Sequence, residues 1–138
     1  MVTKNGKKNN NLILFIERTN VYIITKEFHF SASHELKKLP ETHQCYRLHG
    51  HNYILKVELQ SEDLDSYDFV LDYGLLTKVK TYIDERFDHR HLNDVLETNN
   101  PTAELMAKHF FDLFKPDFSQ ISAIHVSETP KTWAIYRK

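Results

Sequence analysis

Alternating apolar and polar positions predict four strands of an antiparallel sheet. One strand begins near residue 21 and ends at His34, and a second runs from His49 to about Gln60. Two later runs, Ile121–Glu128 and Thr132–Arg137, predict two further strands joined by a turn. In the second strand, period-two alternation places five side chains on one face: His51, Tyr53, Leu55, Val57 and Leu59.

Between the two pairs of strands, apolar residues recur at the spacing of two amphipathic helices. The first helix is capped by Asp72, ends near Asp88–His89 and carries an apolar stripe of Leu75, Leu76, Val79, Ile83 and Phe87. The second helix has Pro101 in its first turn, ends at Pro116 and buries Ala103, Met106, Ala107, Phe110 and Phe114. The order β-β-α-α-β-β predicts an α+β fold, with a four-stranded antiparallel sheet and two helices on one face. Exposed sheet edges favour self-association into a homo-oligomer.

Length and composition indicate one ordinary globular domain. The chain has 138 residues, is 41% hydrophobic and 27% charged, and carries a formal net charge of -1. This charge gives no attraction to nucleic acid or to an acidic membrane. The single cysteine excludes an internal disulfide and suits a reducing compartment. Leu12–Ile16 is shorter than the ~7–15-residue core of a signal peptide. We therefore expect a cytoplasmic protein in which residues 1–20 form an N-terminal extension, either flexible or an extra strand.

Three histidines carry the strongest chemical signal in the chain. His49 and His51 are two apart on a strand and point to the same face, with Gly50 between them. His34 ends the preceding strand, on the face that also carries Phe28, Phe30 and Ala32. Three imidazoles without a fourth protein ligand are typical of a catalytic zinc with an open position. The alternative is that these strand histidines serve only as hydrogen-bonding groups.

Cys45 lies four residues before His49, and three roles are open to it. It can be a fourth metal ligand, an inert buried thiol, or a thiolate whose pKa is lowered beside a dication. A thiolate next to the metal would be suited to accept a proton from a C–H group that the metal acidifies. The position so close to the histidines favours the catalytic role.

Two carboxylates and one further histidine complete the candidate site. Asp88–His89 follows the first helix, and it is either a solvated helix end or an imidazole oriented by a carboxylate for proton transfer. Glu128 ends the third strand, and it is either exposed past the sheet or held in a pocket. In a pocket, its carboxylate can accept paired N–H bonds from a guanidine-like heterocycle.

The chain resembles the 6-pyruvoyltetrahydropterin synthase superfamily over about residues 21 to 137. The resemblance rests on motifs in matching order: Phe30–His34, Cys45–His51, Asp72–Tyr73, Asp88–His89, Pro101–Glu104 and Ser127–Thr129. Three residues separate Cys45 from His49, as in the bacterial 6-carboxytetrahydropterin synthases, whereas the animal pyruvoyl enzymes carry a longer insertion. Phe87–Asp94 also resembles the bacterial branch.

The resemblance implies a role for each matching residue. It implies one zinc ion per subunit on His34, His49 and His51. Cys45 would accept a proton, and His89, supported by Asp88, would be its relay partner from a neighbouring subunit. The residues implied to line the pterin pocket are Thr102, Glu104 and Glu128, of which Glu128 would anchor the pterin's amino-pyrimidine edge and belong to the proton relay.

The resemblance further implies the fold, the assembly and the reaction. Residues 21–138 would form a tunnelling-fold domain in a hexamer built from trimers, with sheets joined into a barrel and active sites at subunit interfaces. The reaction would convert 7,8-dihydroneopterin triphosphate to 6-carboxy-5,6,7,8-tetrahydropterin, acetaldehyde and triphosphate for queuosine (7-deazaguanine) biosynthesis. The alternatives are a 6-pyruvoyltetrahydropterin synthase, a non-catalytic zinc- or pterin-binding module, and a structural zinc site with Cys45 as fourth ligand.

Overall fold

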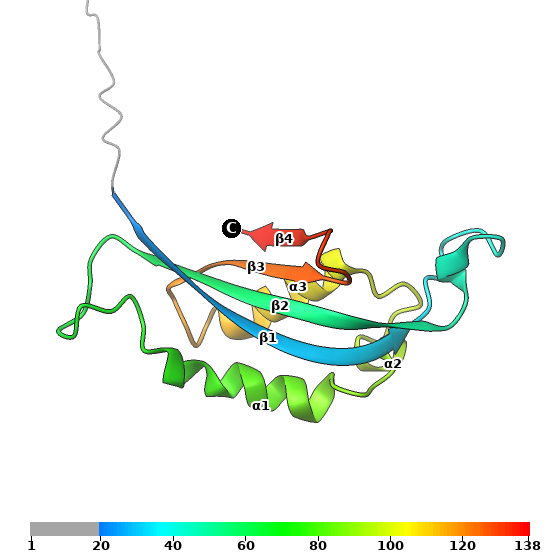
Figure 1. Ribbon diagram of the computed structural model, residues 1–138, viewed down its shortest axis with the longest axis horizontal. Helices are drawn as coiled ribbons and strands as arrows, with labels where there is room; N and C mark the ends of the chain where they lie inside the picture. The colour runs from blue at the N-terminus through cyan, green and yellow to red at the C-terminus, as the bar shows by residue number, and fades with distance from the viewer. Residues whose placement is uncertain (1–19) are drawn as a thin grey trace, which may run out of the picture.

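The structure is a computed structural model that describes residues 20–138. Its sheet has the order β1-β2-β3-β4, every neighbouring pair antiparallel, with strands β1 (Tyr22–His34), β2 (His49–Ser61), β3 (Ile121–Ser127) and β4 (Ala134–Arg137). Helix α3 (Ala103–Phe114) lies across β3 and β4, and α1 (Thr77–Arg86) lies along β1 (Figure 1). The predicted α+β fold is confirmed. The expectation for the N-terminal extension lies outside the described residues, except for Asn20.

The two long strands expose one face and bury the other, as their alternation predicts. In β1, Phe28, Phe30, Ala32 and His34 are buried against the helices. In β2, Tyr53, Leu55, Val57 and Leu59 are completely buried. The long antiparallel pairing of β1 with β2 brings His34 opposite His49 and Ala32 opposite His51. This register gathers the three histidines at one end of the sheet.

The first helix begins later than its sequence pattern suggests. Residues Tyr73–Leu76 form a 3₁₀ turn, η2, and the Asp72 carboxylate accepts a hydrogen bond from Gly74 N in this turn. Because 3₁₀ geometry breaks the four-residue spacing, Leu75 is 56% exposed, and its expected place in the buried stripe is wrong. The rest of the stripe, Leu76, Val79, Ile83 and Phe87, is buried as predicted.

The segment before α3 differs from the prediction in two ways. A short helix, α2 (Leu92–Val95), was not predicted, and it buries Leu92. Thr102 is the N-cap of α3, its hydroxyl accepting a hydrogen bond from Leu105 N, so Pro101 lies before the helix instead of in its first turn. The buried face contains Met106, Ala107, Phe110 and Phe114 as predicted and also Phe111, while Ala103 is only partly buried.

A charged network occupies the face of the sheet opposite the helices. Glu58 in β2 is 7% exposed, and its carboxylate accepts hydrogen bonds from Ser122 Oγ (2.8 Å) and Arg137 (3.3 Å) and pairs with His125 Nε2 (2.9 Å). Burial alone would raise the pKa of Glu58, but the hydrogen bonds from Ser122 and His125 and the charge of Arg137 outweigh it and lower that pKa. The network therefore joins β2, β3 and β4.

The last two strands are shorter than predicted. Strand β3 ends at Ser127 and β4 begins at Ala134, so Glu128 and Trp133 both belong to the connection between them. Within the described part of the chain, no helix has the length and apolar character needed to span a bilayer.

Candidate metal centre and adjoining cavity

The three predicted metal ligands converge at the junction of β1 and β2. One ring nitrogen from each of His34, His49 and His51 lies within 4.8 Å of the others, and these three residues form the one such group found among residues 20–138. Gly50 lets the strands approach closely here, because a Cβ at this position would lie 3.1 Å from the Ala32 carbonyl oxygen.

Backbone carbonyls orient two of these imidazoles. His34 Nδ1 lies 2.9 Å from the Pro101 carbonyl oxygen, and His49 Nδ1 lies 2.7 Å from the Arg47 carbonyl oxygen. Because a carbonyl only accepts hydrogen bonds, both Nδ1 atoms carry the proton, and in the neutral rings both Nε2 atoms carry lone pairs. These two Nε2 atoms lie 3.0 Å apart, so two lone pairs face each other.

A divalent cation fits this arrangement of donors. Two nitrogens bound to one tetrahedral zinc at about 2.0–2.1 Å are separated by about 3.3 Å, close to the observed distance. His51 Nε2 is buried and has no hydrogen-bond partner among the described residues, as expected of a ligand atom. Burial lowers the pKa of His34 and of His51, which favours the neutral imidazoles that a metal requires.

Cys45 lies outside the group of three histidines. It is a half-buried free thiol in a 3₁₀ turn, η1 (Gln44–Tyr46), just before β2. Two hydrogen bonds fix this turn, from Cys45 N to the His43 ring and from Leu36 N to the Cys45 carbonyl oxygen. The second bond ties η1 to the segment that follows His34. The thiol is therefore held near the end of β1 without being grouped with the three ligand atoms.

Asp88 and His89 form a pair that is hydrogen-bonded to the outer edge of β1. Asp88 Oδ1 accepts a hydrogen bond from Ser31 N (2.9 Å), and His89 N donates to the Ser31 carbonyl oxygen (2.6 Å). The Ser31 hydrogen bond, aided by that of His89, lowers the pKa of Asp88. Asp88 Oδ2 lies 3.0 Å from His89 Nδ1, and the His89 side chain is 82% exposed. His89 has a positive φ of 58°, a left-handed conformation that residues other than glycine seldom adopt.

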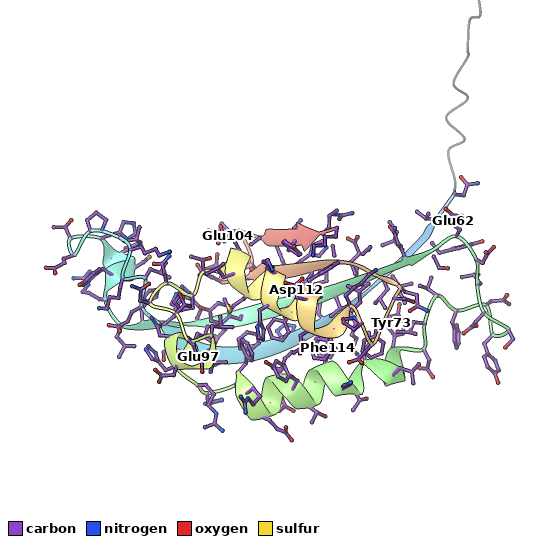
Figure 2. The ribbon with its side chains drawn as sticks, turned by 180° about the vertical axis from the view of Figure 1, so that it is seen from behind. Glu62, Tyr73, Glu97, Glu104, Asp112 and Phe114 are labelled. Carbon is purple, nitrogen blue, oxygen red and sulfur yellow. The ribbon has the colours of Figure 1, made fainter. Side chains whose placement is uncertain are left out.

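Glu128 connects the three histidines to an adjoining cavity. Its two carboxylate oxygens lie 3.8 Å from His34 Nε2 and 3.9 Å from His51 Nε2. It also lines a cavity of about 310 Å³ together with Thr102 and Glu104. Figure 2 shows Glu104 at the first turn of α3, beside β4. The structure thus brings together the three residues expected to line a pterin pocket, next to the candidate metal site.

A family model described as "6-pyruvoyl tetrahydropterin synthase" matches residues 23–138. The chain belongs to this family. One similar solved structure is that of Caenorhabditis elegans 6-pyruvoyl tetrahydropterin synthase, with a TM-score of 0.74 and 28% sequence identity. The match covers 88% of this chain and 98% of the C. elegans chain. The predicted tunnelling fold is that of such neighbours.

Curated relatives within the family carry the name 6-carboxy-5,6,7,8-tetrahydropterin synthase. The protein of Rickettsia felis is 31% identical over 130 residues, 77% of this chain and 93% of that protein. The protein of Synechocystis is 31% identical over 84% of this chain and 93% of that protein. The protein of Bacillus subtilis is 26% identical over 83% of this chain and 84% of that protein.

The sequence alone did not identify two residues that lie at the site, Tyr53 and Trp133. Tyr53 is completely buried beside the histidines, its hydroxyl has no partner among residues 20–138, and burial raises its pKa. Trp133 lines the cavity with Glu128. Tyr53 follows the period-two pattern of a core residue, and Trp133 lies in the connection between β3 and β4. Residue spacing does not mark either position as part of a site. The one available indication is that Tyr53, two residues beyond His51, shares its face of the strand.

Proposed function

We propose that this protein is a zinc-dependent lyase that converts 7,8-dihydroneopterin triphosphate and water to 6-carboxy-5,6,7,8-tetrahydropterin, acetaldehyde and triphosphate. The observation that carries the proposal is the convergence of two unprotonated Nε2 atoms, 3.0 Å apart, beside a cavity lined by Glu128. The names of the bacterial relatives support this product, and with it a role in queuosine (7-deazaguanine) biosynthesis.

His34, His49 and His51 would hold the metal. When bound, zinc supplies a Lewis acid that acidifies the substrate carbon next to a side-chain hydroxyl. The hydrogen bonds of His34 and His49 to backbone carbonyls keep their Nε2 atoms directed at one point. The three histidines leave a fourth position for substrate, as a catalytic site requires.

Cys45 is the residue we assign to proton abstraction. Its separation from the three ligand atoms supports a thiol that reacts with substrate instead of binding the metal. The hydrogen bonds that hold η1 fix the backbone that carries the thiol. A thiolate is well suited to accept a proton at neutral pH when positive charge nearby lowers its pKa.

Asp88 and His89 would relay the proton from a neighbouring subunit. Asp88 orients the imidazole through Nδ1, which leaves His89 Nε2 for the proton transfer. A side chain that is 82% exposed can enter the site of an adjoining chain. This supports an assembly in which subunits join their sheets and share active sites, as in a hexamer built from trimers.

Glu128 would anchor the amino-pyrimidine edge of the pterin. A carboxylate accepts two parallel N–H bonds from such an edge, in the way it binds a guanidinium group. Thr102 and Glu104 line the same cavity, whose volume of about 310 Å³ is at the lower end for ligand sites of ~300–1,000 Å³. The position of Glu128 between this cavity and the three histidines supports a carboxylate that contacts the bound ring.

A 6-pyruvoyltetrahydropterin synthase is the second candidate, favoured by the similarity to the C. elegans protein. The two are distinguished by mass spectrometry of the products that zinc-loaded protein forms from 7,8-dihydroneopterin triphosphate. Carboxytetrahydropterin with acetaldehyde supports the proposal. Pyruvoyltetrahydropterin as the sole product supports the second candidate, and no turnover despite bound zinc supports a non-catalytic binding module.

A further inference from the structure

Trp133 is the single tryptophan of the chain and lies on the wall of the cavity that contains Glu128. It precedes β4, and a hydrogen bond from Thr132 N to the Thr129 carbonyl oxygen closes the turn before it. Its side chain is 37% exposed and does not belong to the hydrophobic core or to the residues packed against that core. Core packing therefore does not account for a large aromatic ring at this position.

We infer that Trp133 is the stacking wall of the pterin pocket and positions the flat ring of the substrate. This inference rests on the proposed function, since it concerns the same cavity. Hydrogen bonds from a pterin edge to Glu128 fix the ring at one side only and leave its tilt free. An aromatic face in contact with the heterocycle restricts the tilt, because flat π systems stack in offset parallel geometry.

Lys56 holds the indole in place. Its ammonium nitrogen lies 4.5 Å from the centre of the Trp133 ring, a cation–π contact, and 3.5 Å from a carboxylate oxygen of Glu27. The contact comes from β2, which also carries His49 and His51, so the indole is positioned by the strand that holds the metal site. Trp133 acts on substrate binding and takes no part in proton transfer.

The test uses the fluorescence of the single tryptophan in the zinc-loaded full chain, with neopterin as an unreactive probe. Neopterin should quench Trp133 emission saturably, with the dissociation constant that equilibrium dialysis gives. Trp133→Leu should weaken neopterin binding in dialysis about tenfold, equivalent to about 1.4 kcal/mol. Trp133→Phe, which keeps an aromatic face, should weaken it less than Trp133→Leu. Tyr67→Leu removes a ring that is 75% exposed and should leave binding unchanged.

Each outcome decides between the inference and the proposed function. Binding in dialysis with unchanged wild-type emission, or with equal affinity in Trp133→Leu, overturns the inference and leaves the proposed function standing. No neopterin binding to the zinc-loaded wild type overturns both. The wild-type quenching experiment needs no substitution, so it decides the matter even if Trp133→Leu fails to fold, which zinc content and circular dichroism report.

Discussion

Mixing two inactive variants tests whether Cys45 and His89 act across a subunit interface. We expect Cys45→Ala and His89→Ala each to lose about 10²–10⁴-fold in turnover, the range for a general acid or base. In each described chain the His89 side chain is 82% exposed beside β1, and Leu36 N donates a hydrogen bond to the Cys45 carbonyl oxygen just after that strand. In the proposed function, each site combines Cys45 of one chain with His89 of a neighbouring chain.

The expected recovery follows from the assembly. A shared site is intact when its Cys45 comes from a His89→Ala chain and its His89 comes from a Cys45→Ala chain. Random equimolar mixing meets both conditions at about one site in four, so about a quarter of the wild-type activity should return. If both residues act within one chain, every site lacks one of them and no activity returns.

The assay refolds the two variants together, carrying different affinity tags, and purifies oligomers that hold both tags. Turnover is measured as triphosphate released from 7,8-dihydroneopterin triphosphate. A mixture of Cys45→Ala with Cys45→Ser is the control and should remain inactive. Mixed oligomers that form but show no recovery would refute a shared site, and a His89→Ala variant with full activity would remove His89 from the mechanism.

Three further predictions concern binding and stability. Glu128→Gln should keep its zinc but weaken neopterin binding in equilibrium dialysis, because a neutral amide no longer accepts two charge-assisted bonds; unchanged binding would exclude it as the anchor. Phe110→Ala should lower the free energy of unfolding by about 3–5 kcal/mol in urea denaturation. Leu105 is 45% exposed on the same helix, so Leu105→Ala should change that free energy by less than about 0.5 kcal/mol. Equal effects of the two substitutions would contradict the packing. Glu58→Gln should cost about 1.5–3 kcal/mol near pH 7. The pKa of Glu58 is below its ordinary 4.5, so its contribution is complete above that pH and is lost as pH falls through the lowered pKa; a difference that persists at lower pH would argue against the ion pairs.

Much of the fold follows from local periodicity. Buried and exposed positions alternate over most of β1 and β2, so the burial of residues such as Phe30 and Leu55 could be predicted from the sequence. Leu75 could not, because a 3₁₀ turn before α1 changes which residues share a face. The helix Leu92–Val95 is shorter than the windows over which periodicity is visible. Burial of Leu92 is a tertiary effect of the chain returning to β1.

In the candidate site too, some features follow from the sequence and others depend on tertiary contacts. The spacing of His49 and His51 already places both imidazoles on one face. The orientation of His34 depends on the Pro101 carbonyl, 67 residues away, and such a long-range contact leaves no local pattern. Trp133 contacts Lys56 across the sheet, and its place in the cavity follows from where β3 ends and β4 begins. Sequence spacing thus predicts the candidate ligands, and tertiary structure supplies their orientation.

The most direct test of the account measures zinc content and turnover together in Cys45→Ala. If the three histidines hold the metal and Cys45 performs the chemistry, the variant keeps one zinc per chain by atomic emission spectroscopy and loses turnover about 10²–10⁴-fold. Loss of zinc together with activity would instead make Cys45 a fourth ligand and the site structural. Full zinc with full turnover would contradict a catalytic role for the thiol.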